Sequence, residues 1–105
     1  MFVQVDLGTQ PGTVTLEEPA DCTRFHVAVR GDDLGQVDDA LTAAGVGRVE
    51  GDHAFVTIDA LQRLAEGRVP DGWDGDFAAM VDYARTKGWL DPSGTAIQAH
   101  LELDH

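Results

Sequence analysis

Residues 24–46 read RFHVAVRGDDLGQVDDALTAAGV and contain the clearest strand and the clearest helix of the chain. Apolar and polar side chains alternate from Arg24 to Arg30, a period of two that is typical of a strand with one buried face. Residues 31–33, Gly-Asp-Asp, end this strand and offer an aspartate as the N-cap of a helix. Apolar residues then recur at helical spacing as far as Gly45, where a left-handed glycine would end the helix.

Two more strands and a short helix are predicted directly after this segment. Residues 46–50 and 53–58 flank a Gly-Asp dipeptide, a two-residue connection that favours a tight β-hairpin. Asp59 and Gln62 have the spacing of a capping box, so we expect a short helix to begin at Asp59.

A longer helix and a last strand complete the pattern. Asp74 or Asp76 should cap the helix, and Gly88 should end it. Residues 95–103 alternate between apolar and polar side chains, which predicts a strand, but a helix capped by Ser93 fits the same residues.

The first part of the chain predicts a β-hairpin. Residues 3–7 and 13–17 alternate in the same way, and the Pro and Gly within residues 10–13 suit a type II turn between the two strands. The length of 105 residues matches one domain of ordinary size. We therefore expect a single domain, 1–105, in which a hairpin extension, 1–20, precedes a core, 23–103.

The element order of this core is βαββαβ, which is the split βαβ or ferredoxin-like arrangement. The predicted fold class is α+β, with an antiparallel sheet that carries helices on one face. The strands at Phe25 and Phe55 should be central in the sheet, and the C-terminal strand should lie at one edge. The opposite face should be open, and the N-terminal hairpin could fold over the sheet, extend it or reach a second copy.

Basic and imidazole side chains gather on the expected open face. If the odd-numbered residues of the strand at 24–30 pack against helices, its even-numbered residues point the other way. The same alternation in the strands predicted at residues 53–58 and 95–103 places further polar side chains on this face. The side chains expected on the open face are Arg24, His26, Arg30, His53, His100, Glu102 and Asp104.

Two interpretations of this group stay open. In the first, Arg24 and Arg30 form cross-strand ion pairs with Glu102 and Asp104 on a solvated or dimer-covered face. In the second, the group is a site. Guanidinium and imidazole groups suit a small anion, and the candidate ligand-binding residues are Arg24, His26, Arg30 and His53. Imidazoles with a carboxylate suit a divalent metal, and the candidate metal ligands are His26, His100 and Glu102.

Charge excludes several classes of partner. The chain has 19 Asp and Glu against 7 Lys and Arg, a net charge of −12 with neutral histidines. So acidic a chain lacks a basic surface for phosphate backbones and is repelled by anionic membranes, so we expect no nucleic acid and no membrane as partner. The chain has no apolar run of about 18 residues, and its first residues do not resemble a signal peptide, which predicts a cytoplasmic protein.

Few residues suit nucleophilic catalysis or cofactor binding. The single cysteine, Cys22, allows no internal disulfide, and the single serine, Ser93, lies in an expected turn rather than in a G-x-S-x-G motif. The sequence contains no phosphate-binding or dinucleotide-binding loop, so we expect no cofactor. Whether the protein is an enzyme stays open, and a non-catalytic role fits these residues better.

One part of the chain resembles a known family. The residues that carry the resemblance are Phe25, Gly31-Asp32-Asp33-Leu34-Gly35, Val37, Leu41 and Gly45-Val46. They are similar to the first strand, glycine turn and helix of ACT regulatory domains. That family shares the βαββαβ order and often binds amino acids at dimer interfaces, so the resemblance implies a ligand-binding regulatory domain.

Two functional hypotheses follow from these observations. The first is a small, acidic, non-catalytic cytoplasmic protein that acts by association, either as a homodimer or as an accessory subunit of a basic protein partner. The alternative is a small-ligand or metal-binding regulatory domain of the ACT type, or a small enzyme, that uses the histidines and arginines of the open face. The two hypotheses differ in what they expect to cover that face.

Overall fold

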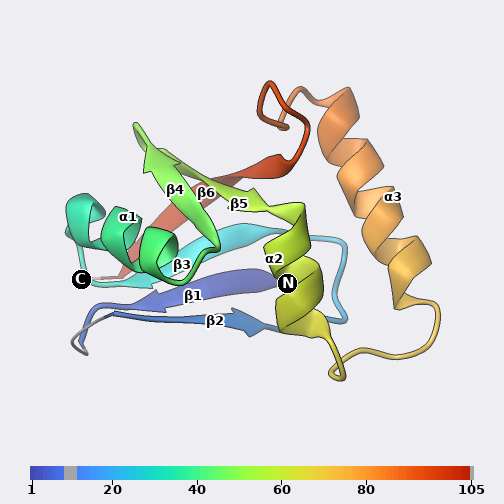
Figure 1. Cartoon of the computed structure of the whole chain (residues 1–105), viewed down its shortest axis with the longest axis horizontal. Helices are drawn as coiled ribbons and strands as arrows, with labels where there is room; N and C mark the ends of the chain where they lie inside the picture. The colour runs from blue at the N-terminus through green and yellow to red at the C-terminus, as the bar shows by residue number, and fades with distance from the viewer. Residues whose placement is uncertain (9–11, 105) are drawn as a thin grey trace.

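The computed structural model describes residues 1–8 and 12–104 of the chain. The predicted turn at residues 10–13 falls mainly on residues outside this part. The described strands are β1 (Phe2–Asp6), β2 (Thr13–Glu17), β3 (His26–Arg30), β4 (Gly47–Glu50), β5 (His53–Thr57) and β6 (Ala96–Asp104). The described helices are α1 (Leu34–Ala43), α2 (Ile58–Ala65) and α3 (Trp73–Thr86), and Figure 1 shows their arrangement.

The strands form one curled sheet in the order β2-β1-β3-β6-β5-β4. β1 pairs antiparallel with β2, which confirms the N-terminal hairpin, and β1 extends the sheet because it also pairs with β3. The β1–β3 and β3–β6 pairs are parallel, whereas the β5–β6 and β4–β5 pairs are antiparallel. The α+β class is therefore confirmed, but the expectation of an antiparallel sheet is wrong, because this sheet is mixed.

β6 lies inside the sheet and not at the predicted edge. Residues 100–104 of this nine-residue strand pair with β3, and residues 96–100 pair with β5 on the opposite side. The two pairings overlap at His100, and on the side that β3 does not reach, the backbone N–H of Gln98 donates to the carbonyl oxygen of Trp89. Ile97, Ala99 and Leu101 are buried along it, as an internal strand requires. Residues 95–103 therefore follow the strand interpretation, and the helix alternative is wrong.

α1 begins and ends where the sequence predicts. The Asp33 side chain accepts a hydrogen bond from the backbone N–H of Gln36, which makes Asp33 the N-cap. The chain leaves the helix at Gly45, whose φ of 69° lies in the left-handed region that glycine adopts without strain. The clearest helix of the sequence thus has the expected caps at both ends.

The caps of α2 and α3 differ from the predicted ones. The chain passes directly from β5 into α2, so the cap of α2 is Thr57, whose hydroxyl accepts the N–H of Ala60, and not Asp59. The N-cap of α3 is Gly72 in a left-handed conformation, without a side-chain cap. Asp74 and Asp76 lie in the first turn of α3, where their carboxylates complement the positive end of the helix dipole.

The core lies between one face of the sheet and the helices. The buried sheet residues alternate with half-buried ones along each of β1, β3 and β5, which confirms the strand periodicity of the sequence. The buried set includes Val3, Val5, Val27, Val29, Ala54 and Val56. Their neighbours on the opposite face, which we call the open face, include Phe2, Gln4, His26, Ala28, His53 and Phe55.

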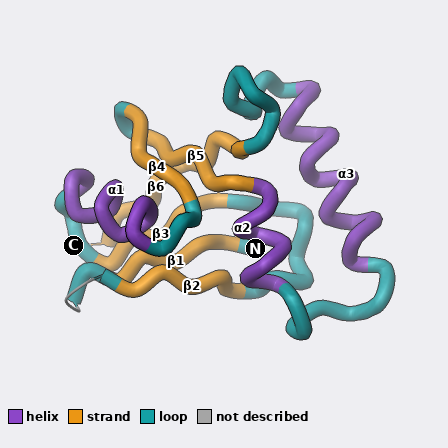
Figure 2. Tube along the Cα trace, viewed as in Figure 1, coloured by secondary structure: helices purple, strands orange, loops and turns teal. Residues whose placement is uncertain are grey.

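The helices have two different positions relative to the sheet. Figures 1 and 2 show α1 and α2 over the near side of the sheet and α3 beside it, beyond the end of the strands. α3 is anchored by Trp73, which stacks on Phe77 at 4.7 Å between ring centroids and donates its indole N–H to the carbonyl oxygen of Pro19. In the described part of the chain, no helix has the length and apolar character to cross a membrane.

Candidate binding site

Three histidines form a row across the open face. His26 on β3 is the register partner of His100 on β6, and His100 is the register partner of His53 on β5. Register partners on neighbouring strands point to the same face, so the three imidazoles share the face that the sequence alternation predicts. We call His26, His53 and His100 the histidine row.

His26 is held between an aromatic ring and a carboxylate. It stacks on Phe2 with ring centroids 5.0 Å apart, and its Nε2 lies 3.4 Å from Oε2 of Glu102. Two of the three predicted metal ligands, His26 and Glu102, therefore meet as a pair, while the third, His100, is exposed. Within residues 1–8 and 12–104, no group of three His, Cys, Asp or Glu side chains is placed to hold a metal ion.

The arginines of the predicted anion site lie at opposite ends of β3. Arg24 precedes the strand, and Arg30 is its exposed last residue. Six residues of extended chain separate them by about 20 Å. The structure therefore does not gather Arg24, His26, Arg30 and His53 around one point. Glu102, which one interpretation paired with an arginine, contacts His26.

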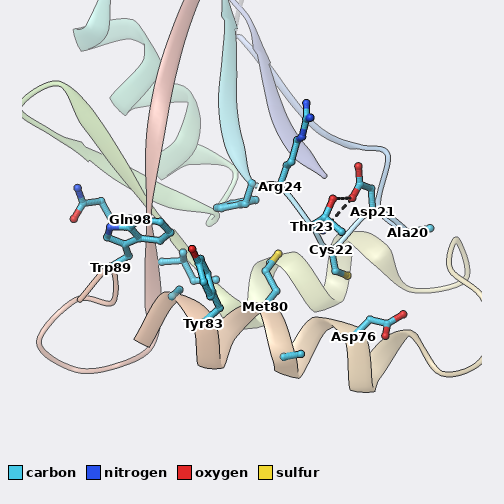
Figure 3. A pocket seen from close by; sticks show the side chains of 14 residues that line it. Ala20, Asp21, Cys22, Thr23, Arg24, Asp76, Met80, Tyr83, Trp89 and Gln98 are labelled. Atoms are coloured by element: carbon cyan, nitrogen blue, oxygen red, sulfur yellow. Dashed lines mark hydrogen bonds between the residues drawn. The ribbon is translucent and has the colours of Figure 1, made fainter. Parts of the chain in front are cut away.

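A groove lies between α3 and residues 20–25, the segment that leads into β3. Its volume is about 580 Å³. Apolar walls come from Phe25, Met80, Tyr83, Trp89 and Ile97, and polar groups at its margins come from Asp21, Thr23, Arg24, Asp76 and Gln98. Figure 3 shows Trp89 and Tyr83 at one end of this groove and Cys22 and Asp76 at the other. We call it the α3 groove.

A smaller pocket joins the α3 groove to the histidine row. Its volume is about 310 Å³, and it shares Phe25, Trp89 and Gln98 with the groove. Its other lining residues are Asp52, His53 and His100. Nδ1 of His53 lies 3.3 Å from Oδ1 of Asp52. Two of the predicted site residues thus line a pocket, which we call the imidazole pocket, and Arg24 lines the groove beside it.

Exposed aromatic rings gather at one end of the α3 groove. Tyr83 is 56% exposed and Trp89 is 42% exposed, and their rings meet edge to face at 5.8 Å. In the described part of the chain, the other large hydrophobic side chain with comparable exposure is Leu103. An exposed cluster of large apolar side chains is informative because single, scattered ones are ordinary. The alternation and helical spacing of the sequence did not predict this exposed position of Trp89.

The other end of the α3 groove is acidic. Partial burial raises the pKa of the Cys22 thiol most, and the nearby carboxylates of Asp76 and Asp21 raise it further, while the N-terminal ammonium and Trp73 act to lower it. Hydrogen bonds from the hydroxyl and backbone N–H of Thr23 lower the pKa of Asp21 and keep it ionised. The Asp21 carboxylate therefore contributes negative charge at this end of the groove.

Sequence reasoning missed most of the α3 groove. One signal was present in Tyr83, which lies outside the apolar stripe of Phe77, Met80, Val81 and Ala84 on α3. An aromatic residue off the buried stripe of its helix is a candidate for a contact surface.

Comparison of the chain with protein-family models, with curated proteins and with solved structures finds no match.

Proposed function

We propose that this protein is a non-catalytic binding protein and that the α3 groove is its ligand-binding site. The observation that supports this most is the gathering of Tyr83 and Trp89 at one end of an apolar groove of about 580 Å³. Small-molecule sites are usually concave, mostly apolar and about 300–1,000 Å³ in volume, with a few polar groups that set orientation. The α3 groove has each of these properties.

The cysteine and the serine of this chain support binding more than catalysis. The raised pKa of Cys22 keeps its thiol protonated, and a thiol is a poor nucleophile compared with a thiolate. The Ser93 hydroxyl donates to the carboxylate of Asp91 within a turn and lies 3.0 Å from each of its oxygens. A hydroxyl bound in this way serves the turn, and the lowered pKa of Asp91 makes its carboxylate a weak base for activating that hydroxyl.

Two adjacent alanines of α3 offer a matched test. Ala79 lines the α3 groove, whereas Ala78 is exposed and does not line it. Ala79→Trp should fill the groove, and Ala78→Trp should leave it open. With Nile red, an uncharged apolar dye, as probe, we expect wild type and Ala78→Trp to bind alike and Ala79→Trp to bind at least about tenfold more weakly.

Circular dichroism on both variants would establish that the fold is kept. Dye binding to Ala79→Trp with wild-type affinity, or no saturable binding to the wild-type protein, would contradict the proposal. Tyr83→Ala gives a second variant, because it removes an exposed ring of the groove without adding volume.

A second candidate function is self-association through the open face. Arg30 and Arg48 share this face with the histidine row, in a chain that otherwise carries a large excess of acidic residues. Asp6, Glu17, Glu50 and Glu102 supply the opposite sign on the same face. Two copies of the chain would pair these opposite charges across the face, and Phe2 and Phe55 would add apolar contact.

Sedimentation at micromolar concentration tests this second candidate. Ala28 is half-buried on the open face, and Ala43 is exposed at the end of α1. Wild type and Ala43→Arg should sediment as dimers and Ala28→Arg as a monomer. A wild-type monomer would rule out this form of association and leave the groove proposal unaffected.

A further inference from the structure

We infer that the ligand of the α3 groove is an apolar cation, with an aromatic ring at the Tyr83–Trp89 end and an ammonium group at the Asp76 end. This inference rests on the proposed function and adds the chemical class of the ligand. Its basis is the polarity of the groove, whose two ends are lined by different side chains, aromatic rings at one end and carboxylates at the other (Figure 3).

The aromatic end is suited to a ring. Tyr83 and Trp89 meet edge to face at 5.8 Å, and Phe25 lines the same groove. A further ring can add to such a cluster in edge-to-face or offset stacked geometry, which contributes beyond the apolar area it buries. The Nζ of Lys87 already lies 5.4 Å from the centre of the Tyr83 ring. A positive group of the ligand would be repelled at this end, so the ring and not the ammonium belongs here.

The opposite end is suited to a positive charge. Asp76 is exposed on the first turn of α3, and within residues 1–8 and 12–104 it has no ion-pair partner. Asp76 and Asp21 line the groove together with Cys22, and after partial burial the carboxylate of Asp76 is the next largest effect that raises the pKa of the Cys22 thiol. An ammonium group at this end would gain the carboxylate of Asp76 and would lose little hydration, because the site is open to water.

The cations near the groove do not neutralise Asp76. Lys87 is engaged at the aromatic end, and Figure 3 shows the guanidinium of Arg24 pointing away from α3. Arg24 and the N-terminal ammonium act on Asp21, and the ammonium also acts on Cys22, but within the described residues neither forms an ion pair with Asp76. The net charge of −12 also raises the local concentration of cations and lowers that of anions around the whole protein. Charge complementarity therefore favours a cationic ligand over an anionic one.

Three probes with the same ring and chain length test the charge of the ligand. They are 3-phenylpropylamine, 3-phenylpropan-1-ol and 3-phenylpropanoate, each titrated by calorimetry at low salt. We expect the amine to bind most tightly and the carboxylate least tightly. An exposed ion pair contributes modestly, so Asp76→Asn should weaken the amine about three- to fivefold and leave the alcohol unchanged.

Asp74→Asn is the matched control, because Asp74 lies in the same first turn of α3 but outside the α3 groove. It should leave all three affinities as in wild type. High salt should reduce the preference for the amine in wild type and not in Asp76→Asn. A second readout is protection of Cys22 from iodoacetamide, which the bound amine should give and the carboxylate should not.

The outcomes separate this inference from the proposed function. Equal affinity for amine, alcohol and carboxylate, with no effect of Asp76→Asn, would overturn the cationic ligand, while loss of Nile red binding in Ala79→Trp would still support the groove. Failure of the dye and of all three probes to bind would overturn both. Tighter binding of the carboxylate would point instead to the histidines of the imidazole pocket as the charged partner.

Discussion

The backbone N–H of Gln98, at the start of β6, donates a hydrogen bond to the carbonyl oxygen of Trp89, just beyond α3. The N–H of Trp89 donates in turn to the carbonyl oxygen of Ala84 in the last turn of the helix. Trp89 is therefore fixed between α3 and the sheet, although its ring is exposed. This explains how one side chain can line both the α3 groove and the imidazole pocket.

The two tryptophans should differ in fluorescence. Trp73 is 4% exposed and Trp89 is 42% exposed, so acrylamide should quench Trp89 and leave Trp73 largely unaffected. Trp89→Phe should shift the remaining emission to shorter wavelength and abolish most of the quenching. Quenching that survives in Trp89→Phe would show that Trp73 is open to solvent and that α3 is not packed as described.

The same substitution at the two tryptophans should have unequal effects on stability. Trp73→Phe removes the hydrogen bond to Pro19 and replaces a buried indole with a smaller phenyl ring. Both changes should lower the free energy of unfolding, by about 1–3 kcal/mol in total. Trp89→Phe changes an exposed ring and should stay within about 0.5 kcal/mol of wild type. Urea unfolding followed by circular dichroism measures both, and equal effects would contradict the anchoring role of Trp73.

The local pattern of the sequence predicted much of this fold because one strand face is determined by alternation alone. The period of two in residues 24–30 and 95–103 places His26 and His100 on the same face, and the register of β3 and β6 then puts them side by side. The order of strands depends on pairings between distant segments. Nothing in the local pattern of β6 distinguishes an internal antiparallel neighbour of β5 from an edge strand, and the parallel pairing with β3 was missed for the same reason.

The α3 groove could not be predicted from local sequence patterns, because it too depends on contacts between distant segments. Its walls come from residues 20–25, from α3 and from the start of β6, which are far apart in the chain. Asp76 was expected to serve only as a helix cap, because sequence alone places it at the start of a helix and says nothing of Cys22 facing it. The candidate site is therefore a product of tertiary packing, whereas the histidine row follows from secondary structure.

Alanine substitutions at two glycines should change the stability of the protein in opposite directions. A Cβ at Gly47 would clash with the carbonyl oxygen of Phe55, so Gly47→Ala must displace the β4–β5 hairpin and should lower the free energy of unfolding by about 1–3 kcal/mol. A Cβ at Gly75, in the first turn of α3, meets nothing within 4 Å, and Gly75→Ala should add about 0.5–1 kcal/mol of stability. Thermal unfolding measures both, and tolerance of Gly47→Ala would contradict the close approach of β4 and β5.

The reactivity of Cys22 should report on Asp76. Partial burial and the carboxylate of Asp76 both raise the pKa of the thiol, so Asp76→Asn should lower that pKa and increase the thiolate fraction at mildly alkaline pH. Alkylation by iodoacetamide should then be faster in Asp76→Asn than in wild type and unchanged in Asp74→Asn. Mass spectrometry over time gives the rates, and an unchanged rate in Asp76→Asn would separate Asp76 from the groove wall.

Asp91 should contribute to the acid stability of the turn before β6. Desolvation acts to raise its pKa, but hydrogen bonds from the Ser93 hydroxyl and the backbone N–H groups of Ala96 and Thr95 outweigh this effect and lower it. A lowered pKa in the folded state means that the stabilisation is present above the unfolded value of about 3.9 and is lost as the pH falls through the folded value.

Asp91→Asn should therefore be less stable than wild type at neutral pH, and the difference should shrink as the pH falls below about 4. The asparagine amide keeps one carbonyl acceptor but loses the charge that strengthens the hydrogen bonds to Ser93 and the backbone. Asp71→Asn, in the exposed loop before α3, should leave the stability at neutral pH unchanged. Urea unfolding over a pH series measures the difference, and a gap between wild type and Asp91→Asn that stays constant into strong acid would show that the charge of Asp91 does not stabilise this turn.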